Sequence, residues 1–294
     1  MAKFVPDVTT NRWVIIAEGR SKRPQEPKGA AGINKICVFC PGFERIPGEE
    51  LYRVGTGAPY EPGWQVRVIR NKYQITDFHE VIIHSPDDRA DIDTLPLEQV
   101  HRILLTFRER FNVNSKNGHV LIFNNVGEQA GASINHPHSQ LVVIPKQINV
   151  DALAMEPITN VVMDNRHFTV FCPEFSQWPF ETWIAPKRRN VYFGQITAEA
   201  IGDLAAVLSE TLKRLLAHLS GASHEHPGVP MVTFKDGPSY NFFIHFGQDW
   251  YIRIIPRLIH RAGFELGTGL SVNIMDPADA AQILKQEIKI PNAS

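Results

Sequence analysis

Residues 136–145 read His136-Pro137-His138-Ser139-Gln140-Leu141-Val142-Val143-Ile144-Pro145. Because successive side chains of a strand alternate between its faces, His136, His138 and Gln140 are expected to project from the same face. Imidazole titrates near neutrality, so its neutral, nucleophilic form is available at working pH. The amide of Gln140 can donate hydrogen bonds to phosphate oxygens, where charge builds as a bond to phosphorus forms. The stretch predicts a strand that begins with a cluster able to attack phosphorus.

The alternative is a structural role, since a single histidine on a half-buried strand is usually satisfied by a backbone carbonyl. Two histidines at positions i and i+2, followed by a glutamine and preceded by a glycine-bearing loop, are harder to explain in this way. Polar clusters rarely enter apolar strands without a use. The pattern therefore favours a functional site.

The segment directly before this stretch carries a recognisable pattern of its own. It reads Phe123-Asn124-Asn125-Val126-Gly127-Glu128-Gln129-Ala130-Gly131-Ala132-Ser133-Ile134-Asn135. With these residues the chain resembles the histidine-triad superfamily, and within it the galactose-1-phosphate uridylyltransferase family. Small histidine-triad hydrolases usually carry a third histidine where Gln140 stands, so the resemblance implies transfer to an acceptor over hydrolysis. A weaker likeness extends from about residue 6 to about residue 285.

The resemblance implies a role for each matching residue. His138 would attack the α-phosphorus of a nucleotide sugar and become covalently nucleotidylated, and a second sugar 1-phosphate would then accept the nucleotidyl group. Gln140 and Ser133 would hold phosphate oxygens. The positions implied near the nucleotide are Arg20, Arg23, Asn71, Asn125, Gly127 and Gly131. From the residues alone, the glycines and Asn71 could equally be turn residues, and the two arginines a solvated basic loop.

A pair of thiols near the amino terminus has the spacing of a zinc knuckle. Cys37 and Cys40 are separated by two residues, although one such pair is only moderately specific. The resemblance supplies His136 as a partner and places Asp88 where many relatives have a histidine; His84 is a second candidate for that place. The expected zinc is structural. No second metal site is expected, because Asp249 and Tyr251 replace the His-x-His of many relatives.

Near the carboxyl end, residues 262–269 match a family segment that reaches into the sugar site of the partner subunit. Glu265 is the position carried over as a sugar-binding residue. This resemblance also implies a homodimer. The galactose-contacting glutamine of the family is replaced by Ser271 here, which weakens the expectation of galactose itself.

Composition excludes several classes of function. A net charge of −1 provides no general attraction to nucleic acid or membrane. The 43% hydrophobic content is that of a globular protein, and three unevenly spaced cysteines do not form a disulfide framework. The start of the chain lacks a signal-peptide core, and no stretch approaches the ~18 apolar residues that span a bilayer. The expected compartment is the cytoplasm.

Hydrophobic periodicity predicts two copies of one α+β unit, each an antiparallel sheet backed by a helix. In the first copy, strands are expected at 64–71, 78–84, 119–124 and 140–144, with a helix at 95–111. In the second, strands are expected at 167–172, 180–185, 240–246 and 250–255, with a helix at 197–219 capped by Thr197. We place the halves at residues 1–150 and 151–294. Aligning them sets Asp249 opposite His138, so one reactive site per chain is expected.

Three functions fit these observations. The first is a uridylyltransferase acting between a UDP-hexose and a hexose 1-phosphate. The second is an enzyme that splits an ADP-sugar or a dinucleoside polyphosphate with phosphate as the acceptor. The third is a non-catalytic nucleotide-binding protein, against which the intact His136, His138 and Gln140 argue.

Overall fold

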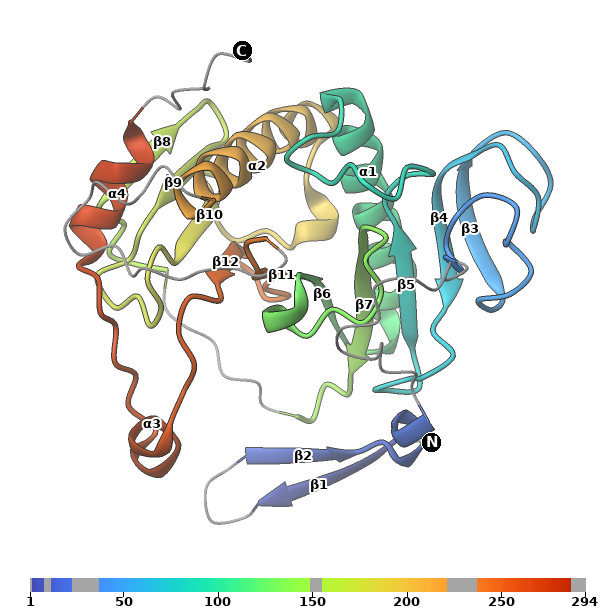
Figure 1. Ribbon diagram of the computed structural model, residues 1–294, viewed down its shortest axis with the longest axis horizontal. Coiled ribbons are helices and arrows are strands. Elements are labelled where there is room, and N and C mark those ends of the chain that lie inside the picture. Colours follow the sequence, from blue (N-terminus) through green and yellow to red (C-terminus); the bar gives the residue numbers. More distant parts are fainter. Residues whose placement is uncertain (1, 8–11, 23–36, 149–154, 221–236, 287–294) are drawn as a thin grey trace.

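The fold is built on one antiparallel sheet of ten strands in a computed structural model (Figure 1). The structure describes residues 2–7, 12–22, 37–148, 155–220 and 237–286. Across the sheet the strands run in the order β3-β4-β5-β7-β6-β11-β12-β10-β9-β8. The first five are β3 (Glu50–Gly55), β4 (Trp64–Arg70), β5 (His79–Ile83), β7 (His138–Ile144) and β6 (His119–Val126). The other five are β11 (Tyr240–Ile244), β12 (Ile252–Pro256), β10 (Thr182–Pro186), β9 (Phe168–Phe171) and β8 (Val161–Asp164).

This strand order confirms the predicted duplication. Each half contributes three strands in sequence, a long helix and then a hairpin, and the two hairpins meet where β6 pairs with β11. The α+β class is also confirmed. The predicted boundary at residue 150 lies outside the described residues and stays a prediction.

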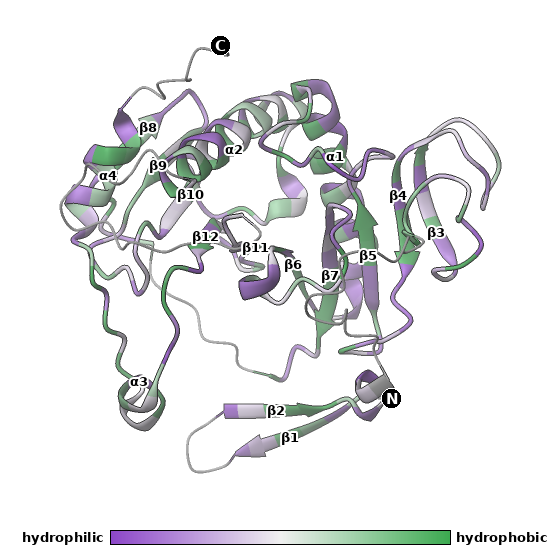
Figure 2. Cartoon of the chain, viewed as in Figure 1, coloured by the Kyte–Doolittle hydropathy of each residue, from purple (hydrophilic) through white to green (hydrophobic). Residues whose placement is uncertain are grey.

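Two helices cover one face of the sheet and form the core with it. They are α1 (Leu97–Asn114) and α2 (Ala198–Leu219), and their apolar sides pack on buried residues of the central strands (Figure 2). The hydroxyl oxygen of Thr197 accepts from the Ala200 amide at 3.2 Å, which confirms the predicted helix cap. Since the helices occupy one face, the functional side chains of the strands can gather on the other.

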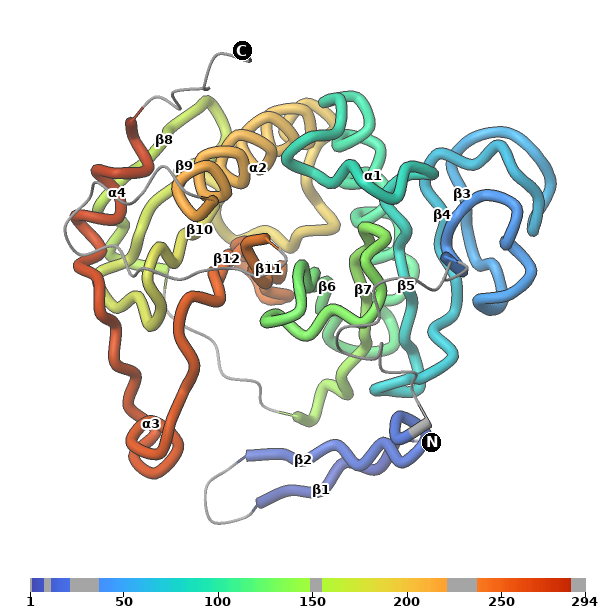
Figure 3. Tube along the Cα trace, viewed as in Figure 1, coloured from blue at the N-terminus to red at the C-terminus, as the bar shows by residue number. Residues whose placement is uncertain are grey.

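Three smaller parts lie outside the main sheet. A separate hairpin, β1 (Lys3–Asp7) with β2 (Arg12–Ile16), lies below it in the view of Figure 3. The chain after β12 forms a projecting arm with the short helix α3 (Gly263–Thr268) at its tip, and α4 (Pro277–Lys285) then packs back near β8. Across the described residues, no helix combines the length and the apolar character that crossing a bilayer requires.

Candidate active site

His138 is the first residue of β7 and is held in one defined tautomer. Its Nδ1 lies 2.8 Å from the carbonyl oxygen of His136, which can only accept, so Nδ1 carries the proton. The lone pair is therefore on Nε2, for which the described part of the chain offers no hydrogen-bond partner. Burial, opposed by that hydrogen bond, lowers the pKa of His138 to about 4. The ring is thus neutral at physiological pH, with its lone pair on Nε2.

Gln140 lies two residues further along β7, on the same face as His138. Its Oε1 is 3.0 Å from Nε2 of His79, a β5 residue whose Nδ1 accepts from the Ile75 amide at 3.0 Å. The Nε2 of His79 therefore carries the proton and donates to Gln140. Because the oxygen of the Gln140 amide is held in this way, its NH₂ group is the part left to donate to a ligand.

Two residues expected near the nucleotide, Asn71 and Arg20, lie beyond His79. The Nδ2 of Asn71 lies 3.1 Å from Nε2 of His79, and its Oδ1 accepts from the Tyr73 amide at 2.8 Å. Arg20 then donates from Nη1 to the Tyr73 carbonyl at 2.8 Å. The structure thus joins Arg20 to Asn71 through Tyr73 and places Asn71 beside His79, where Nδ2 of Asn71 and the protonated Nε2 of His79 are both donors. Neither the sequence pattern nor the resemblance singled out His79; its alternation with Val81 and Ile83 on β5 was the available signal.

The loop between β6 and β7 is supported from the second half of the chain. A side chain at Gly127, where φ is +82°, would place its Cβ 2.1 Å from Oγ of Ser239. Asn241 of β11 donates from Nδ2 to Oδ1 of Asn125 at 2.8 Å and to the Ala130 carbonyl at 2.9 Å. Gly127 is therefore needed for this close approach, and the second half positions the loop beside His138.

Asn241→Ala tests this support. Without the amide, Oδ1 of Asn125 and the Ala130 carbonyl lose their shared donor, and the loop is less well fixed. We expect nucleotide affinity, measured by calorimetry, to fall about tenfold, the factor that corresponds to 1.4 kcal/mol. Asn112→Ala is the matched control, because that exposed amide donates to the Gly194 carbonyl on the helix side. Equal affinities for the two variants would contradict the proposed role.

Gly131 and Ser133 lie in the same loop. Gly131 has φ of +80° and open space where a side chain would begin, so it closes the short helical turn Glu128–Ala130. Its amide donates to the Glu128 carbonyl at 2.9 Å, within the loop. Ser133 is half-buried in the same loop. The roles of Gly131 and Ser133 toward a phosphate remain predictions.

His136 lies directly before β7, and the ring of Phe39 contacts both His136 and His138, with centroids 6.2 and 5.3 Å away. The strand begins only at His138, because Pro137 has no amide hydrogen to donate to a ladder. His136 thus precedes the strand, and its Nε2 donates to the Ser85 carbonyl at 2.8 Å. Its Nδ1 lies 3.4 Å from Sγ of Cys37 and 3.6 Å from Sγ of Cys40. The common face of His136 and His138 therefore stays a prediction, which their shared contact with Phe39 supports.

These three residues have the geometry of a metal site. A tetrahedral Zn²⁺ with bonds of about 2.3 Å to sulfur and about 2.05 Å to nitrogen sets the sulfur–nitrogen separation at about 3.6 Å. The observed separations of 3.4 and 3.6 Å match that edge, and Oδ2 of Asp88 lies 3.6 Å from Sγ of Cys40. The hydrogen bond to Ser85 leaves the lone pair of His136 on Nδ1, facing the thiols. The residues present fit a zinc ion.

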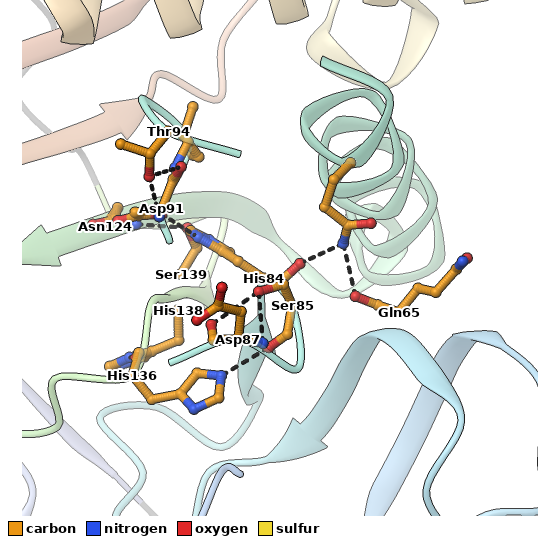
Figure 4. A network of polar contacts seen from close by, with 12 residues as sticks. Gln65, His84, Ser85, Asp87, Asp91, Thr94, Asn124, His136, His138 and Ser139 are labelled. Carbon is orange, nitrogen blue, oxygen red and sulfur yellow. Dashed lines mark hydrogen bonds and ion pairs between the residues drawn. The ribbon is translucent and has the colours of Figure 1, made fainter. Parts of the chain in front are cut away.

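His84 does not belong to this group. Its Nδ1 is 2.7 Å from Oδ1 of Asp91, and its Nε2 is 2.8 Å from Oγ of Ser139, on the helix side of β7 (Figure 4). Both ring nitrogens are occupied there, so the alternative that His84 completes the metal site is wrong. Asp88 is the carboxylate that approaches the thiols.

The remaining predicted residues lie apart from His138. Glu265 sits on α3, where its carboxylate accepts from the Ala262 amide at 2.9 Å and so caps that helix. Within the described chain, no hydrogen bond or ion pair joins it to the residues around His138. Arg23 lies outside the described residues. The sugar-binding role of Glu265 and the nucleotide-binding role of Arg23 stay predictions.

The second half presents aromatic rings where the alignment expects the counterpart of this site. Tyr251 stacks on Trp183 with ring centroids 4.1 Å apart, and on its other side it stacks on His245 at 4.8 Å. Asp249 accepts from the Asn190 amide at 2.6 Å, before β12 begins. These contacts support the expectation of one reactive site per chain.

Comparison with known proteins agrees with this geometry. The family model "Galactose-1-phosphate uridyl transferase, N-terminal domain" matches residues 78–144. An ADP-glucose phosphorylase of Arabidopsis thaliana is 27% identical, over 95% of this chain and 91% of its own length. A galactose-1-phosphate uridylyltransferase of Thermotoga maritima is 25% identical, over 96% of this chain and 97% of its own length. The crystal structure of an Arabidopsis thaliana ADP-glucose phosphorylase with bound ADP-glucose superposes with a TM-score of 0.71. It is 25% identical, over 98% of this chain and 99% of its own.

Proposed function

Because this chain carries the N-terminal domain of the galactose-1-phosphate uridylyltransferase family and resembles its members along nearly its whole length, we propose that it is a nucleotidyltransferase using His138 as a covalent carrier. The substrate class is a nucleoside diphosphate hexose. The observation that carries the proposal is the orientation of His138, whose protonated Nδ1 is held by a carbonyl while Nε2 keeps its lone pair.

The reaction has two displacements at the same phosphorus atom. In the first, the Nε2 lone pair attacks the α-phosphorus, a P–N bond forms, and the bond to the bridging oxygen breaks, so that sugar 1-phosphate leaves with the electron pair. In the second, a phosphate oxygen of the acceptor attacks and the P–N bond breaks. The hydrogen bond from Nδ1 to the His136 carbonyl persists throughout and stabilises the cationic ring of the intermediate.

The neighbouring residues complete the scheme. The NH₂ group of Gln140 would donate to a non-bridging oxygen of the α-phosphate, because His79 already holds its carbonyl oxygen. Arg20 would place a positive charge beside the substrate phosphates. Asn125 and the loop from Gly127 to Gly131 would line the nucleoside side. Ser133 would hold a second phosphate oxygen.

Two acceptor chemistries suit this site. In the first, a hexose 1-phosphate takes a uridylyl group from the carrier. In the second, inorganic phosphate takes an adenylyl group from an ADP-sugar; the 27% identity with an ADP-glucose phosphorylase favours this candidate. The chemistry at His138 is the same in both, so the base and the acceptor are what separate them.

Incubation with labelled nucleotide sugars tests the proposal. The protein is mixed with UDP-glucose or ADP-glucose labelled at the α-phosphate, quenched in base and digested, and the acid-labile label is located by mass spectrometry. We expect label on His138 from one of the two, released by hexose 1-phosphate or by phosphate according to the acceptor. Product formation without any labelled histidine would replace this scheme with a single direct displacement.

A structural zinc ion is also part of the proposal. The ion would be held by Cys37, Cys40, His136 and Asp88. It would link the amino-terminal segment to the start of β7. Zinc neutralises thiolates and carboxylates brought this close together.

We propose a homodimer in which the projecting arm is buried. The arm exposes large apolar side chains, with Leu266 75% and Leu270 61% accessible in the single chain. Large apolar side chains exposed next to one another mark an interaction surface. Light scattering is expected to give twice the mass of one chain, and replacing both leucines with glutamate is expected to give monomers. A monomeric unmodified protein would contradict the dimer.

A further inference from the structure

A buried chain of hydrogen bonds lies beneath the nucleophilic strand, on the face that packs against the helices (Figure 4). It runs from Asp91 to His84 at 2.7 Å, from His84 to Ser139 at 2.8 Å, and from Ser139 to Asn124 at 3.2 Å. His84 and Ser139 are fully buried. Ser139 is therefore inaccessible to a substrate, and this serine–histidine–aspartate arrangement is not a nucleophilic triad.

The protonation of this chain follows from its partners. Burial disfavours the charged form of Asp91, but the hydrogen bonds that its carboxylate accepts from His84 and from the Ile92 amide hold its pKa below the ordinary value. The Asp91 carboxylate thus accepts from Nδ1 of His84. Nε2 of His84 then accepts from the Ser139 hydroxyl, whose oxygen accepts from Nδ2 of Asn124. Each donor has one acceptor, so the arrangement is fixed.

Residues 84 and 85 fix the polypeptide backbone on both sides of His138. The His84 amide donates to the Pro137 carbonyl at 3.1 Å, while the His84 ring binds Ser139. Ser85 accepts from Nε2 of His136. Residues 84 and 85, which follow β5, thus contact His136, Pro137 and Ser139. The ring of His138, between these residues, is left to react.

We propose that His84, oriented by Asp91, is a positioning residue for His138. The inference rests on the proposed carrier role of His138. A hydrogen bond to Ser139 fixes the backbone next to the nucleophile and so sets the direction of its Nε2 toward the phosphorus. Displacements of about 1 Å can lower the rate of such a reaction about 100-fold. Among the described contacts, none joins the His84 ring to a residue on the face away from the helices. His84 therefore affects His138 only through the backbone of β7.

The experiment measures nucleotidylation of His138 in a single turnover with the labelled sugar nucleotide that modifies the unaltered protein. The variants are Ser139→Ala, which removes one oxygen, and His84→Ala. Each is expected to slow adduct formation 10- to 100-fold, the range typical of groups that orient a reacting residue. The final yield should remain one adduct per chain, and nucleotide affinity should stay within threefold. The double variant should be no slower than the slower single variant, because both substitutions remove the same hydrogen bond, between His84 and Ser139.

His167→Ala is the matched control, because His167 makes the same kind of contact with Asp203, at 2.6 Å, in the other half of the chain. We expect its rate to equal that of the unaltered protein. A variant that is merely destabilised would react at the normal rate with a reduced yield, and that result for Ser139→Ala would overturn the positioning role alone. Absence of an adduct in the unaltered protein would overturn the carrier role and the inference together.

Discussion

Replacing His138 by glycine is expected to lower nucleotidyl transfer by a factor on the order of 10⁴ or more, because the residue proposed to form the covalent bond is gone. Nucleotide affinity should change by less than about tenfold. The groups expected to bind the phosphates and the nucleoside, among them Gln140 and Arg20, are held by contacts with other residues. Steady-state turnover and calorimetric titration of the same preparation measure the two quantities.

His119→Gly is the matched control, since His119 also begins a strand but has its ring packed at a tilt against Phe246, with centroids 4.5 Å apart. This variant should retain turnover within about threefold, which separates loss of the nucleophile from the general cost of glycine in a strand. Turnover at the normal rate by His138→Gly would show that another residue carries the nucleotidyl group.

The part of the site that depends on local pattern could be predicted. The alternation of β7 places His138 and Gln140 on one face, as expected from their spacing of two residues. His136 precedes the strand and has its Nδ1 near the thiols, so its common face with His138 stays a prediction that the shared contact with Phe39 supports.

The part that depends on distant pairing could not be predicted in this way. Asn241 reaches Asn125 because β11 pairs with β6 across 116 residues of sequence, and nothing near residue 241 indicates that partner. His79 likewise contacts Gln140 through the pairing of β5 with β7. His84 looked like a possible metal ligand, yet the alternation of the sheet sends its ring to the helix side. Sheet order and register decide these contacts.

The metal site combines both kinds of information. The spacing of Cys37 and Cys40 indicated a knuckle, and the resemblance supplied His136 and Asp88. The structure brings the sulfur atoms and Nδ1 of His136 to separations that suit zinc. Sequence spacing alone indicates two candidate ligands, the resemblance adds the other two, and the fold brings them together.

Cys40→Ser is therefore expected to abolish zinc binding and to destabilise the protein. Burial, Cys37 and Asp88 raise the pKa of the Cys40 thiol to about 12, so these groups need a bound cation to share the site as anions. Loss of a metal site belongs to the class of large single-residue effects, and we expect a cost of about 3 kcal/mol in the free energy of unfolding. For a chain of this size that lowers Tm by about 5 °C.

The measurements are zinc content by mass spectrometry after gel filtration and Tm by calorimetry, with and without a chelator. The unaltered protein should hold one zinc ion per chain and lose stability when the chelator is added, whereas Cys40→Ser should hold none and be insensitive to it. Cys172→Ala is the control thiol, because Cys172 is buried in the second half of the sheet, with Thr182 as its contact. It should keep its zinc.

The same substitution should also slow transfer about tenfold, since ligands and their hydrogen-bond partners act together. His136 would lose the ion that fixes its ring, and its carbonyl is the group that holds Nδ1 of His138. The effect on transfer is therefore transmitted through the backbone of residues 136–138. An unaltered protein that purifies without zinc, and whose Tm is unchanged by added zinc, would show that Cys37, Cys40 and His136 pack together without a metal ion.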